Sequence, residues 1–343
     1  MLINKTAPFV SIVVPVRDEG EYVEKCINSL IDQDYPAHLY EILVVDGISK
    51  DHSIEIVQSL SNKYHNIFLL ENPHRLTSFG LNIGIRESKG EIIIILGAHS
   101  FVPCDFIRKN AEFIKKADGS YCVGGPIKTL GDTHIAKTIS LAMSSPFGVG
   151  DAIFRYTERE AYADTVAFGA YKKEVFNKIG LFDEELVRNQ DDEFNYRLRK
   201  AGGNIFITPQ IKSFYFSRAN FKKLFIQYFR YGFWKTRVFQ KHPGMMRLRQ
   251  FVPGIFVLAL MFSAVFAFYY PVWLLLFTSI IISYIVFSLY FSFSIARKEG
   301  WKHFSILPVV FAILHFSYGL GFLAGCVRFS FLWFQKEKEP PRL

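Results

Sequence analysis

The longest uncharged stretch of the chain limits its possible folds more than any other feature. Residues 250–296 are 47 consecutive positions without a charged residue or a histidine. About 20 apolar residues are enough to cross the hydrocarbon core of a bilayer as a helix. We therefore predict two membrane-spanning helices, at 253–270 and 271–293.

A third apolar segment, 304–327, is interrupted only by His315. It is predicted either to span the membrane or to form a re-entrant or interfacial hairpin. With it, the membrane region extends over 251–334 and is followed by a polar tail at 335–343. A histidine inside a membrane segment deserves a functional test, but a hydrogen bond to a neighbouring helix is the simpler explanation of His315.

The loop between the second and third apolar segments indicates the orientation. It carries Arg297, Lys298 and Lys302, and short basic loops normally face the cytosol. Because two predicted spans precede this loop, residues 1–250 are expected to be cytosolic as well. The chain is thus predicted to be a multi-pass protein of the cell membrane.

The segment directly before the membrane region is strongly basic. Residues 218–250 contain nine basic residues and no acidic one, whereas 1–217 contain 24 basic and 28 acidic residues. Each Lys or Arg near an anionic bilayer surface contributes roughly 1 kcal/mol of attraction, and aromatic residues are interleaved with the basic ones. We predict interfacial helices here with membrane lipids as partners, and no nucleic-acid partner, because no nucleic-acid-binding motif is present.

The N-terminal part, 1–217, alternates short β-branched runs with amphipathic stretches. This is the pattern of an α/β domain in which crossover helices connect parallel strands. The predicted strands are 11–16, 41–46, 67–70, 92–96 and 121–123. The predicted helices are 21–32, 51–61, 77–88 and 103–116. Ligands of open α/β sheets bind outside the carboxyl ends of the strands, so we expect the site in the loops that follow them.

Three of these loops carry unusual residues, at Pro15 to Glu19, Val44 to Asp51 and Leu96 to Ser100. Further motifs follow in order along the chain: Asn72-Pro73, Leu81 to Ile85, Phe168 to Tyr171, Phe182 to Glu184, Asn189 to Glu193 with Arg197, and Gln227 to Tyr231. Over about 1–240 this set resembles the family 2 glycosyltransferases with a GT-A fold, a Rossmann-like nucleotide-sugar-binding domain. The details resemble the membrane-anchored type of succinoglycan and exopolysaccharide biosynthesis.

The resemblance implies a nucleotide-sugar site at the first loops. The residues that it assigns to this site are Pro15, Arg17, Glu19, Asp46, Asn82 and Ala98. Asp46 would accept the imide hydrogen of uracil, and Glu19 would face the ribose or uracil. The alternative for Asp46 is a helix cap or turn, positions that Asp favours in any protein.

The residues expected at the diphosphate differ from the family pattern. Most of the family holds Mg²⁺ or Mn²⁺ with an Asp-x-Asp motif, and here Gly97-Ala98-His99 stands in its place. His99 would ligate the metal, although imidazole suits softer ions than Mg²⁺. The alternative is that His99 is only a polar loop residue.

The resemblance also implies a general base for an inverting transfer. The alignment from Arg197 makes Asp191 the base that removes the proton from the acceptor hydroxyl, with Asp192 and Gly169 on the acceptor side. An acidic run at a helix start is also favoured by the helix dipole alone.

Gln227 and Arg230 resemble the Gln-x-x-Arg-Trp element of membrane-bound synthases, with Tyr231 in the position of the Trp. They would then contact the acceptor and the diphosphate. The alternative is a membrane-surface helix without a catalytic part.

The sequence thus predicts an inverting glycosyltransferase that moves a sugar from a nucleotide donor, which the resemblance implies is a UDP-sugar, to a polyprenyl-pyrophosphate-linked saccharide. One alternative is a polyprenyl-phosphate glycosyl synthase, whose acceptor is the lipid phosphate itself. The other is a catalytically silent relative that binds nucleotide or lipid.

Overall fold

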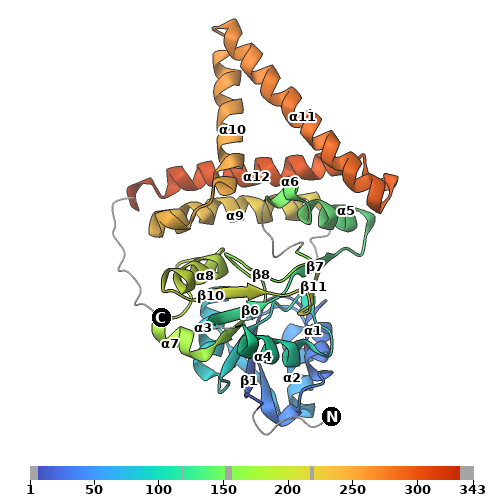
Figure 1. Cartoon of the computed structure of the whole chain (residues 1–343), viewed down its shortest axis with the longest axis vertical. Coiled ribbons are helices and arrows are strands. Elements are labelled where there is room, and N and C mark those ends of the chain that lie inside the picture. The colour runs from blue at the N-terminus through green and yellow to red at the C-terminus, as the bar shows by residue number, and fades with distance from the viewer. Residues whose placement is uncertain (1–6, 118, 151–156, 217–219, 333–343) are drawn as a thin grey trace. The chain divides into compact units, whose positions relative to one another are not determined.

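The computed structural model describes residues 7–117, 119–150, 157–216 and 220–332. The described residues form two compact units. The first, here called the sheet unit, consists of 7–128 and 157–215. The second, the helical unit, consists of 129–150 and 216–332. Figure 1 labels their elements.

An eight-stranded sheet is the centre of the sheet unit. Its strand order is β3-β2-β1-β4-β9-β6-β10-β8. The strands are β1 Val10–Val16, β2 Tyr40–Asp46, β3 Ile67–Glu71, β4 Ile92–Ile95, β6 Ser120–Gly124, β8 Ala161–Tyr162, β9 Ala170–Lys172 and β10 Asn204–Ile207. A second sheet contains β5 Ser100–Phe101, β11 Ser213–Phe216 and β7 Ile127–Leu130 in the order β5-β11-β7.

All five predicted strands are present, and β1 to β4 are parallel as expected. The sheet as a whole is mixed, however, because β9 runs antiparallel between β4 and β6 and β8 runs antiparallel beside β10. The predicted parallel arrangement therefore holds for β1 to β4, and the two short antiparallel strands were not predicted. They are two and three residues long, too short for an alternation of side chains to reveal them.

Helices cover both faces of the large sheet. They are α1 Val23–Ile31, α2 Ser53–Lys63, α3 Thr77–Glu87, α4 Phe106–Lys116, α7 Lys173–Ile179 and α8 Gln190–Lys200. Successive residues of β1 point to opposite faces, so Ile12 and Val14 join one apolar core with α1 and α4. Val13 joins the other core, with α3, α7 and α8. This period of two follows from strand geometry and explains why the predicted strands read as continuous apolar runs.

The helical unit contains six helices among the described residues. They are α5 His134–Met143, α6 Pro146–Val149, α9 Phe221–Lys241, α10 Leu248–Phe266, α11 Pro271–Glu299 and α12 Leu307–Arg328. Three of them, α10, α11 and α12, are long and apolar enough to cross a membrane. These correspond to the three predicted apolar segments.

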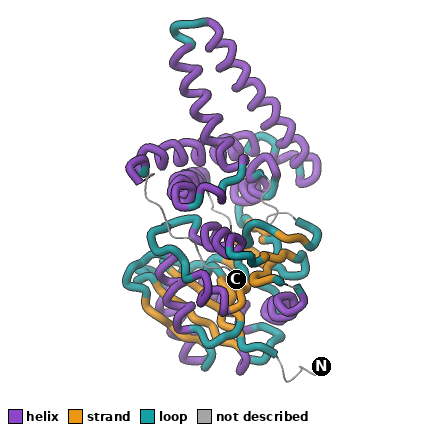
Figure 2. Tube along the Cα trace, turned by 60° about the vertical axis from the view of Figure 1, so that its left-hand side comes forward, coloured by secondary structure: helices purple, strands orange, loops and turns teal. Residues whose placement is uncertain are grey.

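The pair α10 and α11 is arranged differently from the pair α9 and α12. In Figures 1 and 2, α10 and α11 form a hairpin that projects away from α9 and α12, which lie side by side across its base. Only 6% of the apolar window of α11 is buried by protein, compared with 44% of that of α12. The α12 helix is therefore largely covered by other parts of the protein.

Glycines allow α9 and α12 to approach closely. A Cβ at Gly232 would lie 2.1 Å from the carbonyl oxygen of Tyr318, and one at Gly321 would lie 2.0 Å from that of Phe229. Backbone therefore contacts backbone at both positions, as small residues permit between membrane helices.

His315 has the structural role that the sequence favoured. The Tyr284 hydroxyl lies 2.9 Å from Nδ1 of His315, and Nε2 of His315 lies 2.8 Å from the carbonyl oxygen of Phe147. The histidine thus joins α11 and α12 to the short helix α6. The Phe147 ring is inserted among Phe291, Phe311 and His315.

Candidate active site

The loops after β1 and β2 are tied together by backbone-to-side-chain hydrogen bonds. The Asp18 amide donates to Ser49 Oγ (2.9 Å), and the Lys50 amide donates to Asp18 Oδ1 (2.8 Å). Asp18 and Ile48 have left-handed backbone conformations, with φ of 54° and 57°. Such strain at non-glycine residues is often found at functional sites, and here it shapes the sheet edge where ligands bind.

Asp51 adds a second tie between the same loops. Its carboxylate accepts from the Gly20 amide (2.8 Å) and from both the amide and the hydroxyl of Ser53. Although burial alone would raise its pKa, these hydrogen bonds lower the pKa of Asp51 below its ordinary value. The carboxylate therefore stays ionised and continues to accept them.

Asp46 ends β2 at this edge and is almost completely buried. Its two oxygens accept from the amide (3.0 Å) and the hydroxyl (2.5 Å) of Ser49. The residue thus has the turn geometry that was the alternative to a base contact. A carboxylate has about four acceptor positions, so a uracil imide remains chemically compatible with this arrangement.

The other predicted donor-site residues fall into two groups. Pro15, the buried Ala98 and Arg17 lie at the carboxyl edge of the sheet, and the Arg17 guanidinium donates to the Arg75 carbonyl oxygen (3.0 Å). Asn82 is placed differently, because it is buried on α3.

The Asn82 side chain joins α3 to the loop before α8. Its amide donates to the carbonyl oxygen of Phe182 and to Glu184, both at 2.9 Å, and its Oδ1 accepts from the Phe182 amide at 3.0 Å. In this structure its hydrogen bonds hold the 182–184 loop, and a nucleotide contact stays a prediction without support from its surroundings.

His99 forms a hydrogen bond that the sequence analysis did not identify. Its Nδ1 lies 3.1 Å from Oε1 of Glu19, and the two side chains are 24% and 18% exposed. The His99 ring also makes an edge contact with Tyr215. The pairing has a simple origin, because Glu19 and His99 follow β1 and β4, which are neighbouring parallel strands. That adjacency was the signal in the sequence that could have revealed it.

The residues at this edge offer few ligands for a divalent cation. No group of three or more His, Cys, Asp or Glu side chains is close enough to hold a metal ion within the described ranges. Beyond their Nδ1–Oε1 contact, Glu19 has a second carboxylate oxygen and His99 has a second ring nitrogen. Mg²⁺ at phosphate sites usually keeps water and takes only one or two protein carboxylates, so the pair fits a cation that arrives with a diphosphate.

Gly97, two residues before His99, is packed against Phe168. A Cβ at position 97 would lie 3.2 Å from Cε1 of Phe168, and Phe168 itself has a φ of 55°. The aromatic ring thus lies close beside residue 97, and a side chain there would require the ring to shift by a few tenths of an ångström. This contact favours a small residue at the first position of the atypical motif.

The acidic run at the start of α8 divides into different environments. Glu193 is buried and bound by Arg197, whose Nε and Nη2 lie 2.6 and 2.9 Å from its two oxygens. Asp191, in contrast, is exposed, and Asp192 is half-buried. Of the three acids, Asp191 is therefore the most accessible to a substrate.

Gly169 is required by packing. A Cβ there would lie 2.9 Å from both Cys122 Sγ and a Val166 methyl carbon. The glycine lets β9 approach β6, so any effect of Gly169 on the acceptor would act through this packing.

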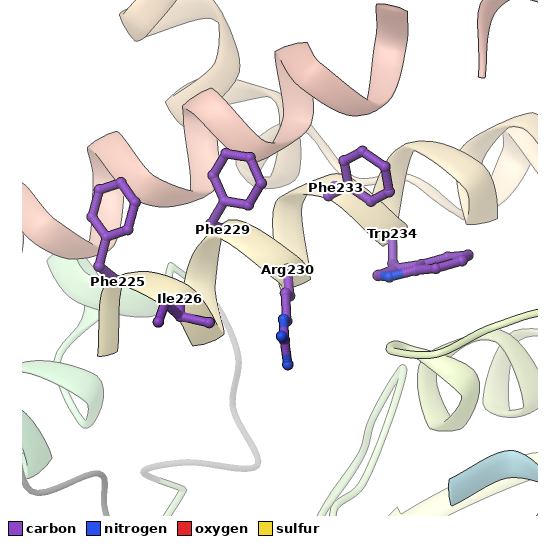
Figure 3. A pocket seen from close by; sticks show the side chains of 6 residues that line it. All are labelled: Phe225, Ile226, Phe229, Arg230, Phe233 and Trp234. Carbon is purple, nitrogen blue, oxygen red and sulfur yellow. The ribbon is translucent and has the colours of Figure 1, made fainter. Parts of the chain in front are cut away.

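The remaining predicted residues belong to the helical unit. Gln227 donates to the Tyr231 hydroxyl at 3.0 Å. Arg230 is exposed in a groove of about 420 Å³ along α9. The groove is lined by Phe225, Ile226, Phe229, Arg230, Phe233 and Trp234. In Figure 3 the three phenylalanines point toward α12, and Arg230 extends to the opposite side of α9 beside Trp234.

Comparison with known proteins identifies the family. The model of the family described as Glycosyl transferase family 2 matches residues 11–180. The succinoglycan biosynthesis protein ExoA of Rhizobium meliloti is 30% identical over 71% of this chain and 73% of its own length. The chain belongs to glycosyl transferase family 2.

Two further similarities extend over nearly the whole chain of this glycosyltransferase. A protein of Methanococcus voltae named dolichyl N-acetyl-alpha-D-glucosaminyl phosphate 3-beta-D-2,3-diacetamido-2,3-dideoxy-beta-D-glucuronosyltransferase is 29% identical over 93% of this chain and 98% of its own. The mannosyltransferase PcManGT of Pyrobaculum calidifontis, solved with GDP-Man and Mn²⁺, matches with a TM-score of 0.56. It covers 90% of this chain and 86% of that one at 16% identity, so it supports the fold alone.

The predicted GT-A fold and the predicted glycosyltransferase class are therefore confirmed. The carboxyl edge of the sheet, which contains Asp46, Glu19 and His99, is the candidate site of this family 2 enzyme, and Asp191 lies in the first turn of α8. The individual residue roles stay predictions.

Proposed function

We propose that this family 2 glycosyltransferase transfers a sugar, with inversion, from a UDP-sugar to a polyprenyl-pyrophosphate-linked saccharide at the cytosolic membrane face. The observation that carries the lipid-linked saccharide acceptor is the nearly full-length match to the Methanococcus voltae protein, whose name specifies a sugar linked to dolichyl through a single phosphate. The diphosphate linkage rests on the resemblance to the exopolysaccharide type. The match to a succinoglycan biosynthesis protein supports the same class of reaction. An acceptor that already carries a sugar is therefore favoured over the bare lipid phosphate.

In the proposed reaction, Asp191 acts as general base. Its carboxylate takes the proton from the acceptor hydroxyl while the acceptor oxygen attacks C1 of the donor sugar. The bond between C1 and the diphosphate oxygen breaks, and UDP leaves with the electron pair. The exposed position of Asp191 in the first turn of α8 supports this role.

Glu19 and His99 would bind the divalent cation, with Mn²⁺ favoured over Mg²⁺ because imidazole suits softer ions. Charge neutralisation at the departing diphosphate is the chemistry that such a cation supplies when bound. Asp46 would hold the uracil and Arg17 the neighbouring part of the nucleotide.

Arg230 would bind the diphosphate of the acceptor lipid. A guanidinium binds phosphate oxygens in a bidentate manner, and the apolar side chains that line the same groove along α9 suit isoprene units. The basic charge of 218–250 supports contact with a membrane surface.

We further propose that only α10 and α11 cross the bilayer and that α12 lies along its cytosolic surface beside α9. The crosswise arrangement of these helices and the greater burial of α12 support this topology. It keeps the basic loop 297–302 and the end of α12 on the same side.

The test uses membranes that contain the full chain and a panel of UDP-sugars. Two acceptors are compared, polyprenyl phosphate and a sugar linked to polyprenyl through diphosphate. We expect transfer only to the sugar-bearing acceptor. Transfer to polyprenyl phosphate itself would identify a polyprenyl-phosphate glycosyl synthase. No turnover with any donor would indicate a silent relative.

Two variants test the base. Asp191→Asn should reduce turnover by about 10²- to 10⁴-fold with little change in UDP binding, while Asp192→Asn, about 100° around the helix, should be much milder. If Asp192→Asn is the inactive variant, the alignment is wrong by one residue. If both remain active, neither acid is the base.

A further inference from the structure

A buried chain of hydrogen bonds lies one helical turn below Asp191. The Tyr171 hydroxyl donates to Oδ1 of Asn195 at 2.9 Å, and Nδ2 of Asn195 donates to Oγ1 of Thr165 at 2.9 Å. All three side chains are buried, and Asn195 is 0% exposed. Because residues four apart share a face of a helix, Asn195 lies directly along α8 from Asp191.

The surroundings of this polar chain are otherwise apolar. Tyr171 packs edge-on against Phe194 and Phe176, which belong to the core formed with α7 and α8. A hydrogen-bonded chain in an apolar environment is strong and dictates orientation, whereas an apolar residue at 195 would only fill space. These hydrogen bonds therefore fix how α8 is rotated on the sheet.

The Thr165 end of this series of hydrogen bonds leads to the other half of the proposed site. Thr165 belongs to the loop between β8 and β9, residues 163–169, which also contains Phe168. Phe168 in turn packs on Gly97, two residues before His99. Two hydrogen bonds, the stretch 165–168 of this loop and one ring contact thus connect α8, which carries Asp191, to the loop that carries His99.

We propose that Asn195 is a positioning residue, whose bridge between Tyr171 and Thr165 holds Asp191 in register with the Gly97–His99 loop. This inference rests on the role of Asp191 in the proposed function. Asn195 itself touches no substrate and acts only through α8. Burial first, and then the nearby Cys122 and Asp191, raise the pKa of Tyr171 well above its usual value, so its hydroxyl remains a donor throughout the working pH range.

The test uses the full chain in lipid nanodiscs, with the UDP-sugar and acceptor that give turnover. Thr165→Val keeps the shape of the side chain but removes the acceptor of the Asn195 amide, and Tyr171→Phe removes the donor. Misplacement of a reacting group can cost about 10²-fold, so we expect both variants to lower kcat by about ten- to a hundredfold. The donor KM and the affinity for UDP, measured by calorimetry, should stay at the wild-type values.

Two matched controls separate positioning from a general loss of stability. Thr165→Ser retains the hydroxyl and should restore most of kcat. Tyr35→Phe also removes a buried tyrosine hydroxyl, one that donates to the Pro8 carbonyl oxygen at the opposite edge of the sheet, and should leave kcat unchanged. A kcat loss in Tyr35→Phe equal to that in Tyr171→Phe would overturn the inference, as would a parallel loss of UDP affinity in Thr165→Val.

The Asp191→Asn background distinguishes this inference from the proposed function. If Asn195 acts by positioning the base, Thr165→Val should cause no further loss once the base is gone. A full additional loss in that background would overturn the inference, and so would wild-type kcat in Thr165→Val when Asp191→Asn is inactive. If Asp191→Asn is fully active, the base assignment fails, and the positioning role fails with it.

Discussion

Replacing Arg197 by methionine should destabilise the sheet unit strongly. The Arg197 guanidinium binds both oxygens of Glu193 and also donates to the carbonyl oxygens of Ile179 (2.6 Å) and Leu181 (2.7 Å). The two charged side chains are only 13% and 2% exposed. Arg197→Met would therefore leave a buried carboxylate without its countercharge and two carbonyl groups without donors.

The size of the effect follows from this burial. Removing one partner of a buried ion pair costs about 3 to 5 kcal/mol, and solvent screening reduces this little when the exposure is so low. For a unit of this size, 1 kcal/mol shifts Tm by about 2 to 4 °C. We therefore expect Arg197→Met to lower Tm by about 6 to 20 °C, measured by circular dichroism on the full chain in nanodiscs.

The chain contains a matched control for this experiment. Lys178 pairs with Glu174 on α7 in the same four-residue spacing, at 3.4 Å, but these side chains are 41% and 50% exposed. Exposed helix pairs contribute only about 0.3 to 0.5 kcal/mol, so Lys178→Met should lower Tm by no more than about 2 °C. Equal shifts in the two variants would refute the argument that burial makes the Arg197 pair important.

Four further predictions concern the metal, the lipid, the pH and the topology. His99→Ala should weaken Mn²⁺ binding measured by calorimetry with UDP present; activity that EDTA and this variant both leave unchanged would exclude His99 as a ligand. Arg230→Lys should lower turnover by about ten- to a hundredfold, the loss expected for a charge-assisted hydrogen bond, without release from the membrane; wild-type kinetics would reduce the segment to an anchor. Burial, and then neighbouring basic groups, lower the pKa of His303 below the usual 6.5. The unfolded chain therefore binds the proton more readily than the folded chain. The contribution of neutral His303 to stability is full above about pH 6.5 and is lost as pH falls through the lower pKa of the folded state. The decrease of Tm on acidification should therefore be smaller in His303→Gln, and an identical decrease would contradict the assignment. An impermeant thiol reagent applied to intact cells should label neither Lys298→Cys nor Ser330→Cys; labelling of Ser330→Cys alone would mean that α12 crosses the bilayer.

The sequence could predict the elements that depend on local pattern. The strands β1 to β4 are continuous runs of β-branched residues, and the helices between them have apolar residues at helical spacing, so their positions agree with the structure within a few residues. The apolar segments at α10 to α12 were equally clear, because their length and lack of charge alone are sufficient. The order of the loop motifs was enough to predict the family.

Only the tertiary structure decided which partners these elements and side chains have. The antiparallel position of β9 and the hydrogen bond between Glu19 and His99 join segments that are far apart in sequence, and no periodicity records such pairings. The position of α12 beside α9 depends on backbone contact at Gly321 and similar glycines, while its hydropathy alone fits a membrane span equally well. Hydropathy and spacing thus determine what each segment is, because they act within a few residues; the long-range hydrogen bonds and packing of the folded chain determine what each side chain can do.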